Sequence, residues 1–379
     1  MTATVAPRAS SAEKDRLRRD FVRLCEIESP SGREREIVDV LLDELRAAGL
    51  DPQEDASAAE TGANAGNVMA RIHGPVGART IMLCAHVDTV PLAGPIEVEE
   101  RDGVLTNRHE AILGADNKAA VAAILGVARR HAAEPPPVGL DLVFTTSEEP
   151  GLRGAKALDL GQLRSEFGFV FDHASPIGEL IVAAPTYYRI EGHFRGKAAH
   201  AGIRPEDGRN AIVAAAAALA SIRLGRLDEG TTANVGRIDG GTAANVVAER
   251  CRVELEARSL DHERAGEVVA EIVDALTASA SDTECDVELE VQEQFRAYRL
   301  PRSAPVVQAA VAALAGVGIE ASCIATGGGS DAHAFQARGL PCLNVANGTE
   351  RNHQPDECVT VYALETMLDA TLGIVAHSA

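Results

Sequence analysis

Three continuous apolar runs in the first half of the chain constrain its fold more than any other feature. They read TIMLCA (80–85), LDLVFTT (140–146) and GFVF (168–171), and a small-residue helix pattern over 117–130 separates the first two. Apolar runs without polar alternation are typical of strands buried on both faces, and helices between such strands are typical of a parallel sheet. The sequence therefore predicts an α/β domain with a mainly parallel sheet covered by helices.

The pattern changes after about residue 183. YYRIEGHFRG alternates apolar and polar residues, as a half-exposed strand does. A helix pattern then starts near Pro205 and runs to Leu224, and two strand patterns follow it. A helix over 261–280 and a strand over 285–292 complete the order β-α-β-β-α-β, which is that of a ferredoxin-like sandwich.

The α/β pattern resumes at about residue 299, so a small domain interrupts a larger one. A chain of 379 residues is too long for one ordinary core, which favours the same division. We expect one domain from residues 1–183 and 299–379, and an inserted α+β domain from residues 184–298. Near the start, Ser31 and Glu34 form a capping-box pattern that predicts a helix ending close to Gly49.

Composition excludes several classes of function. The net charge of −20 repels phosphate backbones, and no basic cluster offsets it, so we expect no nucleic-acid partner. The longest apolar run, Ala211 to Ala220, is far short of the ~20 residues that cross a bilayer. The first twenty residues lack the apolar core of a secretory signal. Seven scattered cysteines without a CxxC pair are typical of reduced thiols, so we expect a cytoplasmic protein.

Side chains that bind metals follow each of the apolar runs. The carboxyl ends of parallel strands meet at one edge of a sheet, so these side chains should converge there. Two imidazoles among several carboxylates suit Zn²⁺ or a similar divalent ion, and a cation relieves the repulsion between crowded carboxylates. The residues are His86, Asp88, Asp116, Glu148, Glu149, Asp172 and His353.

Each of these residues has an ordinary structural interpretation when it is taken alone. A Glu-Glu pair is usually a solvated turn, an Asp before a helix is usually an N-cap, and a loop histidine is usually a surface residue. The convergence of separate segments favours the metal site. Asp88 lies two residues after His86 and faces the same way on a strand, so we expect it to hold the second ring nitrogen of His86.

Eight motifs in order give the chain a family resemblance. They are AHVDTV, LGADNKAAVAAIL, TTSEEPGLRGAKAL, FDHAS, KAAHAG, GGTAANVVAERCRVELEARS, GGGSDA and NHQPDE. Together they resemble the dinuclear zinc peptidase family that includes tripeptidase T, carboxypeptidase G and the aminoacylases. The resemblance covers roughly residues 12–375, and it is greatest to the peptidase-T-like branch.

The resemblance implies a role for each residue at the predicted edge of the sheet. His86 and Asp172 would bind one metal, Glu149 and His353 the other, and Asp116 would bridge the two. Asp88 would support His86, and Glu148 would be the general base. The peptide bond between Asp116 and Asn117 would be cis.

Two positions depart from the family pattern. Asn117 stands where many relatives have Asp, and His173 stands where they often have a small residue. Asn117 is not a ligand position. His173 is either a bystander or a third imidazole near the site.

The resemblance also implies roles for the insert, which would serve as a lid and dimerisation domain. His200 would stabilise the oxyanion from a neighbouring subunit, which makes a homodimer the expected assembly. Asn245 and Arg258 would hold the C-terminal carboxylate or the backbone of the substrate. Gly328 and Ser330 of the TGGGSDA turn would lie close to the substrate, because glycines let the backbone approach it.

The predicted function is hydrolysis of short peptides by a tripeptide-aminopeptidase-like enzyme with two divalent cations. Zn²⁺ is the expected metal, and Co²⁺ or Mn²⁺ would also suit the site. A carboxypeptidase or an N-acyl-amino-acid deacylase on the same metals is the alternative, and the sequence does not separate them. A non-catalytic peptide-binding protein is a third hypothesis; it predicts the loss of a ligand or of the base, and all seven residues are present.

Overall fold

The computed structural model describes residues 7–379, which divide into two compact units. The first unit contains the described chain up to Val182, Leu300–Ala325 and Ser330–Ala379. The second unit contains Ala183–Arg299 together with the short segment Thr326–Gly329. The chain therefore leaves the first unit within β8 (Glu179–Ala184), returns to it at Leu300, and contributes one later turn to the second unit.

The first unit is built on a mixed sheet with the strand order β1-β2-β6-β3-β7-β16-β8, and the short strand β14 (Tyr298–Arg299) pairs with the last residues of β8. Strands β6, β3, β7 and β16 run parallel to one another, and almost every residue in them is buried. This confirms the mainly parallel sheet that the apolar runs predict. The strands are β1 (Gln53–Glu54), β2 (Val68–Ile72), β3 (Thr80–His86), β6 (Gly139–Thr145), β7 (Phe167–His173), β8 (Glu179–Ala184) and β16 (Cys342–Ala346).

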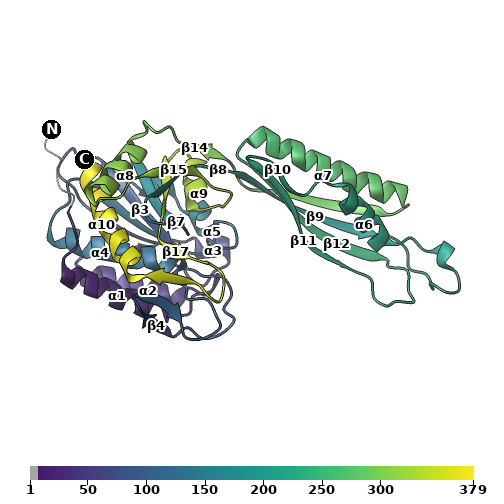
Figure 1. Ribbon diagram of the computed structural model, residues 1–379, viewed down its shortest axis with the longest axis horizontal. Helices are drawn as coiled ribbons and strands as arrows, with labels where there is room; N and C mark the ends of the chain where they lie inside the picture. The colour runs from purple at the N-terminus through teal and green to yellow at the C-terminus, as the bar shows by residue number, and fades with distance from the viewer. Residues whose placement is uncertain (1–6) are drawn as a thin grey trace. The chain divides into compact units, whose positions relative to one another are not determined.

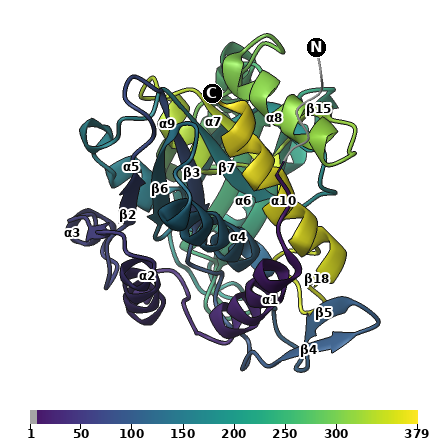
Figure 2. The same ribbon diagram turned by 90° about the vertical axis from the view of Figure 1, so that its left-hand side faces the viewer.

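Helices of the first unit pack on this sheet and on one another (Figure 2). Helix α4 contacts β3 and also α1 and α10, and α10 in turn packs on α8, whereas α9 contacts α5 and β16. The helices are α1 (Ser11–Cys25), α2 (Arg35–Ala47), α3 (Ala58–Thr61), α4 (Ala115–Ala133), α5 (Arg153–Ala157), α8 (Pro305–Gly316), α9 (Asp331–Gln336) and α10 (Val361–His377). No helix within residues 7–379 is long and apolar enough to cross a membrane.

A small antiparallel sheet positions one loop that matters for the site. Its order is β17-β18-β5-β4, and the loop between β17 and β18 carries His353. The strands are β4 (Val98–Arg101), β5 (Val104–Asn107), β17 (Thr349–Glu350) and β18 (Cys358–Thr360). The remaining short pieces are strand β15 (Ser322–Ala325), which pairs with β8, and the 3-10 turn η1 (Leu160–Gln162).

The predicted capping box at the second helix is wrong. Helix α2 begins at Arg35, and its N-cap residue Glu34 makes no side-chain cap. Glu34 is buried, and its Oε1 instead accepts hydrogen bonds from the main-chain N–H of Gly32 at 2.8 Å and of Ser147 at 3.1 Å. The local pattern predicts that the Glu34 carboxylate caps the helix, but it instead accepts a hydrogen bond from Ser147, 113 residues away in the chain.

The second unit is a ferredoxin-like sandwich, as predicted. Its antiparallel sheet has the order β10-β11-β12-β9-β13, and helices α6 and α7 lie along one face of it (Figure 1). Its core comes from both layers, including Ile190, Phe194, Val253 and Ile272. The elements are β9 (Thr186–Arg195), η2 (Pro205–Asp207), α6 (Ala211–Ser221), β10 (Gly225–Asp228), β11 (Thr231–Gly240), β12 (Arg250–Ser259), α7 (His262–Asp282), β13 (Asp286–Phe295) and β14 (Tyr298–Arg299).

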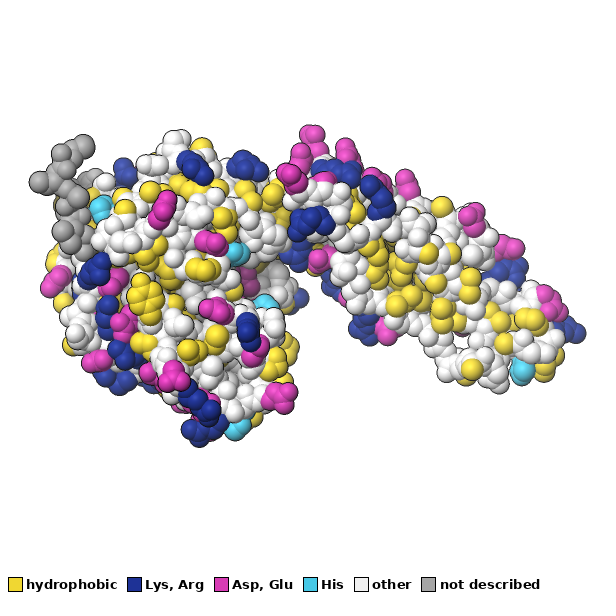
Figure 3. Space-filling model, viewed as in Figure 1, with side chains coloured by type: hydrophobic (Ala, Val, Ile, Leu, Met, Phe, Trp, Pro, Cys, Tyr) yellow, Lys and Arg dark blue, Asp and Glu magenta, His cyan; other side chains and the backbone are white. Residues whose placement is uncertain are grey.

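Helix α6 is shorter than the sequence predicts, and one of its faces is uncovered. It begins at Ala211, where the Asn210 side chain caps it, and Pro205 lies in the separate turn η2. Its exposed side chains are apolar, and hydrophobic atoms gather over this part of the second unit (Figure 3). They belong to Ile212, Val213, Ala216, Ala217 and Ala220.

Candidate metal centre

Neighbouring parallel strands bring the predicted ligands to one edge of the large sheet. Strand β3 lies between β6 and β7 and ends at His86, while Asp172 lies near the end of β7. Glu148 and Glu149 follow the end of β6. Asn344 of β16 fixes the main chain of Asp172 on both sides, since it accepts from its N–H at 3.0 Å and donates to its carbonyl at 2.9 Å.

Asp116 lies between two imidazoles. Its Oδ1 is 3.3 Å from Nε2 of His86, and its Oδ2 is 3.2 Å from Nε2 of His353. The two oxygens of one carboxylate therefore face two different histidines. This is the arrangement of a carboxylate that bridges two cations. The Asp116–Asn117 peptide bond is cis, as the family resemblance implies.

One further carboxylate completes each half of the centre. Asp172 Oδ1 lies 3.6 Å from His86 Nε2, and Glu149 Oε1 lies 3.0 Å from His353 Nε2. A tetrahedral Zn²⁺ with bonds of about 2.0–2.1 Å keeps neighbouring ligand atoms roughly 3.3 Å apart. The observed separations are close to that value, so the donor atoms fit a pair of divalent ions.

Polar atoms without partners also indicate a cation at this position. Within the described part of the chain, Asp116 Oδ1 and Glu149 Oε1 are buried and accept no hydrogen bond. Buried acceptors of this kind are normally paired, and a cation bound between these side chains would pair them. Burial lowers the pKa of the His86 imidazole, but the carboxylates of Asp116, Asp172 and Asp88 outweigh it and raise that pKa well above its usual range.

His86 is held in the tautomer that a metal ligand needs. Its Nδ1 lies 2.9 Å from the main-chain carbonyl of Asp88, and a carbonyl oxygen can only accept. Nδ1 therefore carries a proton, and Nε2 faces Asp116 and Asp172, where it would offer its lone pair to a bound cation. The Asp88 carboxylate is farther away, with its Oδ1 3.6 Å from Nδ1.

The carboxylate of Asp88 has a different set of partners. Its oxygens accept hydrogen bonds from the main-chain N–H of Glu148 at 2.9 Å and of Glu149 at 3.3 Å, and from the Ser31 hydroxyl at 2.6 Å. Asp88 therefore supports His86 through its carbonyl and orients the Glu148–Glu149 turn through its carboxylate. The sequence predicts that the Asp88 side chain holds His86, whereas the main-chain carbonyl makes that contact, and the contacts with the glutamate turn are not indicated by the sequence.

Comparisons with known proteins show that the chain is similar to peptidases. Residues 186–284 match the model of the peptidase dimerisation domain, and residues 67–173 match the model of peptidase family M28. YqjE of Bacillus subtilis is 34% identical over 365 residues, which are 96% of this chain and 98% of that protein. The structure of the aminopeptidase PepT from Bacillus cereus is 34% identical, with a TM-score of 0.87 over 96% of this chain and 98% of that one.

A tripeptidase structure from Staphylococcus aureus is 32% identical, with a TM-score of 0.91 over 99% of both chains. The chain belongs to the peptidase T group of the M20 peptidase family. Peptidase T of Listeria monocytogenes is a more distant relative, 26% identical over 82% of this chain and 76% of that protein.

The position of Glu148 allows two roles in an M20 peptidase. Its side chain is buried, and one of its oxygens lies within 4.8 Å of ligand atoms of His86 and Asp172. Burial, and next the charge of Asp172, raise the pKa of its carboxyl well above the usual range. Geometry alone makes Glu148 either a ligand beside His86 or a base next to the ions.

Glu357 is a residue of the centre that sequence reasoning missed. Its buried carboxylate accepts three main-chain hydrogen bonds of 2.8 Å, from Leu113, Gly114 and Asp116. Glu357 thus joins the segment that carries His353 to the segment that carries Asp116. The NHQPDE motif contains it, but nothing in the local sequence separates it from a solvated loop acid.

The second unit places His200 and Asn245 together and Arg258 elsewhere. The main-chain N–H of Ala201, next to His200, donates to the carbonyl of Asn245 at 3.0 Å. Arg258 is near the far end of β12, eight residues beyond Arg250, which corresponds to roughly 25 Å of strand. Within one chain, Asn245 and Arg258 therefore cannot hold the same carboxylate.

The other predicted positions lie in loops of both units. Gly328 belongs to the second unit, where its N–H donates to Thr326 Oγ1 at 3.1 Å, whereas Ser330 is buried at the start of α9 in the first unit. The groups of metal-binding atoms found in residues 7–379 do not include His173. Burial lowers the pKa of its imidazole.

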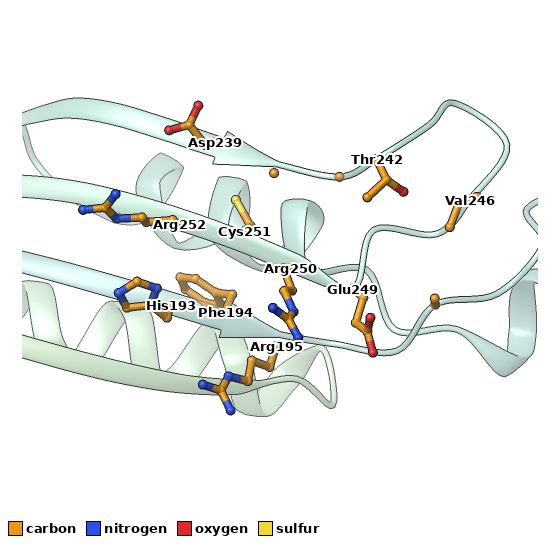
Figure 4. A pocket seen from close by; sticks show the side chains of 13 residues that line it. His193, Phe194, Arg195, Asp239, Thr242, Val246, Glu249, Arg250, Cys251 and Arg252 are labelled. Atoms are coloured by element: carbon orange, nitrogen blue, oxygen red, sulfur yellow. The ribbon is translucent and has the colours of Figure 1, made fainter.

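A hollow of about 650 Å³ lies in the second unit (Figure 4). Its charged side chains include His193, Arg195 and Arg252, and each of them already has an acidic partner. Arg252 lies 2.6 Å from Glu191, His193 lies 2.8 Å from the same residue, and Arg195 lies 3.2 Å from Glu288. These three side chains are therefore already engaged by acidic residues of the second unit.

Proposed function

We propose that the protein is a dinuclear metallo-aminopeptidase that removes the N-terminal residue from short peptides, tripeptides in particular. The observation that carries this proposal is Asp116, whose two oxygens face His86 and His353. The relatives described as an aminopeptidase and a tripeptidase support the substrate class. Zn²⁺ is the proposed metal, because the set of two imidazoles and three carboxylates suits it.

The protein's own residues supply the proton transfers. When bound, the two cations supply Lewis acidity, which lowers the pKa of a water molecule towards neutrality. Glu148 accepts a proton from the water that attacks the amide carbonyl, and it returns that proton to the nitrogen as the C–N bond breaks. Asp88 fixes the turn that aims the Glu148 side chain, since it accepts hydrogen bonds from both glutamate N–H groups.

The assembly we propose is a homodimer in which His200 acts across the interface. His200 and Arg258 lie at opposite ends of the second unit, so two copies are needed if both contact one substrate. The match of residues 186–284 to the peptidase dimerisation domain supports this assembly. The cysteines are free thiols, which supports a cytoplasmic location.

The uncovered face of α6 is the proposed contact between the two copies. It carries no charge, and Ile238 on the neighbouring strand β11 is also exposed. Val213→Asp, which places a charge on this face, should give a monomer with a large loss of peptidase activity. Sedimentation measures the assembly. Val76→Asp is the control, because Val76 is a fully exposed valine in the first unit. A dimeric Val213→Asp variant would refute this interface.

One free tripeptide and its N-acetylated twin test the function. We expect the metal-loaded protein to release the N-terminal residue from the free tripeptide only, and a chelator to stop the reaction. Mass spectrometry identifies the products. Cleavage of the acetylated peptide would favour a deacylase, and release of the C-terminal residue first would favour a carboxypeptidase. Either result would overturn the aminopeptidase proposal.

A further inference from the structure

Three side chains form a row across the sheet of the second unit. Arg258 on β12 pairs directly with Tyr187 on β9, and Tyr187 pairs directly with Phe295 on β13. Directly paired residues of neighbouring strands project from the same face of a sheet. The row therefore places a cation and two aromatic rings next to one another. Tyr187 belongs to the YYRIEG motif, to which the proposed function gives no role.

The guanidinium of Arg258 is held on three sides. Its Cζ lies 4.2 Å from the centre of the Tyr187 ring. Its Nη1 donates to the carbonyl of Gly327 at 2.9 Å, and its Nη2 donates to Glu256 at 3.1 Å. In the part of the chain that the structure describes, the buried Nε has no acceptor. Arg258 is thus fixed in place, and each of its two terminal nitrogens keeps one N–H group that these contacts do not use.

Phe295 fixes the loop that supplies one of these contacts. The Tyr187 and Phe295 rings lie 5.3 Å apart at 59°. A Cβ atom added to Gly329 would lie 2.5 Å from carbons of the Phe295 ring, so only glycine allows the loop to pass there. The ring therefore sets the path of residues 326–329, which includes the Gly327 carbonyl.

We propose that Tyr187 is a positioning residue that holds Arg258 ready for a carboxylate of the peptide substrate, with Phe295 and Gly329 fixing the loop beside it. A carboxylate takes two parallel hydrogen bonds from a guanidinium, which requires the plane of that group to be fixed. Stacking on an aromatic ring fixes it and leaves the N–H edge available. This inference rests on the proposed peptidase function.

The test compares one tripeptide with a free C-terminus and its C-terminal amide. We expect the wild-type protein to prefer the free acid. Tyr187→Leu should raise KM for the acid by roughly tenfold, change kcat little, and remove most of the preference for the acid. Tyr187→Phe keeps the ring and should retain that preference. Tyr188→Leu is the control, because Tyr188 packs on the core side of the same strand.

Calorimetric binding of both peptides in a Glu148→Gln background provides a readout without turnover. If the wild type cleaves neither peptide, the proposed function fails, and the binding preference still tests Tyr187. The inference is overturned if the wild type binds acid and amide equally, or if Tyr187→Leu keeps the wild-type preference. A melting curve of each variant confirms that it is folded.

Discussion

Glu148→Gln is expected to lower kcat by roughly 10²–10⁴-fold while two metal ions per chain remain bound. Glutamine keeps the shape of the side chain but cannot accept the proton of the attacking water. The Asp88 carboxylate binds main-chain N–H groups of the turn, so the substitution leaves its geometry unchanged. Steady-state kinetics with a tripeptide and metal analysis of the same sample measure the two quantities.

Glu149→Gln is the matched comparison, because its side chain lies 3.0 Å from His353 Nε2 and is placed to bind metal. This variant should lose metal as well as activity. Loss of metal from Glu148→Gln would change the role assigned to Glu148. If Glu148→Gln also lost one ion, Glu148 would be a ligand beside His86 and Asp172, a position that its distance from their ligand atoms permits.

The strands of the large sheet are predictable from the sequence because their signal is local. Each continuous apolar run is a buried strand in the structure, and a parallel sheet brings the strand ends together whatever the loops do. The convergence of His86 and Asp172 follows from that topology, whereas Asp116 lies at the start of α4 and depends on longer-range contacts as well.

The contacts that support the site are not predictable in this way. Glu34 has the spacing of a capping-box residue, yet its carboxylate accepts a hydrogen bond from the main-chain N–H of Ser147. Glu357 reaches main-chain groups more than 240 residues away. Such partners depend on how distant segments pack, and periodicity carries no information about that. The separation of Asn245 from Arg258 likewise depends on β12 being extended, which a spacing of 13 residues alone does not reveal.

Glu357→Ala is expected to weaken both the fold and the metal centre. Three buried main-chain N–H groups lose their acceptor, and each unsatisfied donor costs about 1–3 kcal/mol. Water entering the vacated space would satisfy some of them, so we expect a loss of roughly 3–5 kcal/mol in the free energy of unfolding. Urea denaturation of the metal-free protein measures this loss.

The effect of Glu357 on the metal is separable from its effect on stability. Asp116 bridges the proposed ions, and Glu357 holds its main-chain N–H, so metal affinity should fall by about 10–100-fold in the folded variant. Titration against a competing chelator, well below the melting temperature, measures it. Glu357→Gln keeps one acceptor oxygen, so its stability and its metal affinity should both lie between those of the wild type and of Glu357→Ala. Glu350→Ala is the control, because Glu350 lies at the exposed end of β17 and its loss should change neither quantity. If Glu357→Ala is destabilised but binds metal as tightly as the wild type, Asp116 keeps its position without this hydrogen bond. Glu357 would then stabilise the fold only and would not support the metal centre.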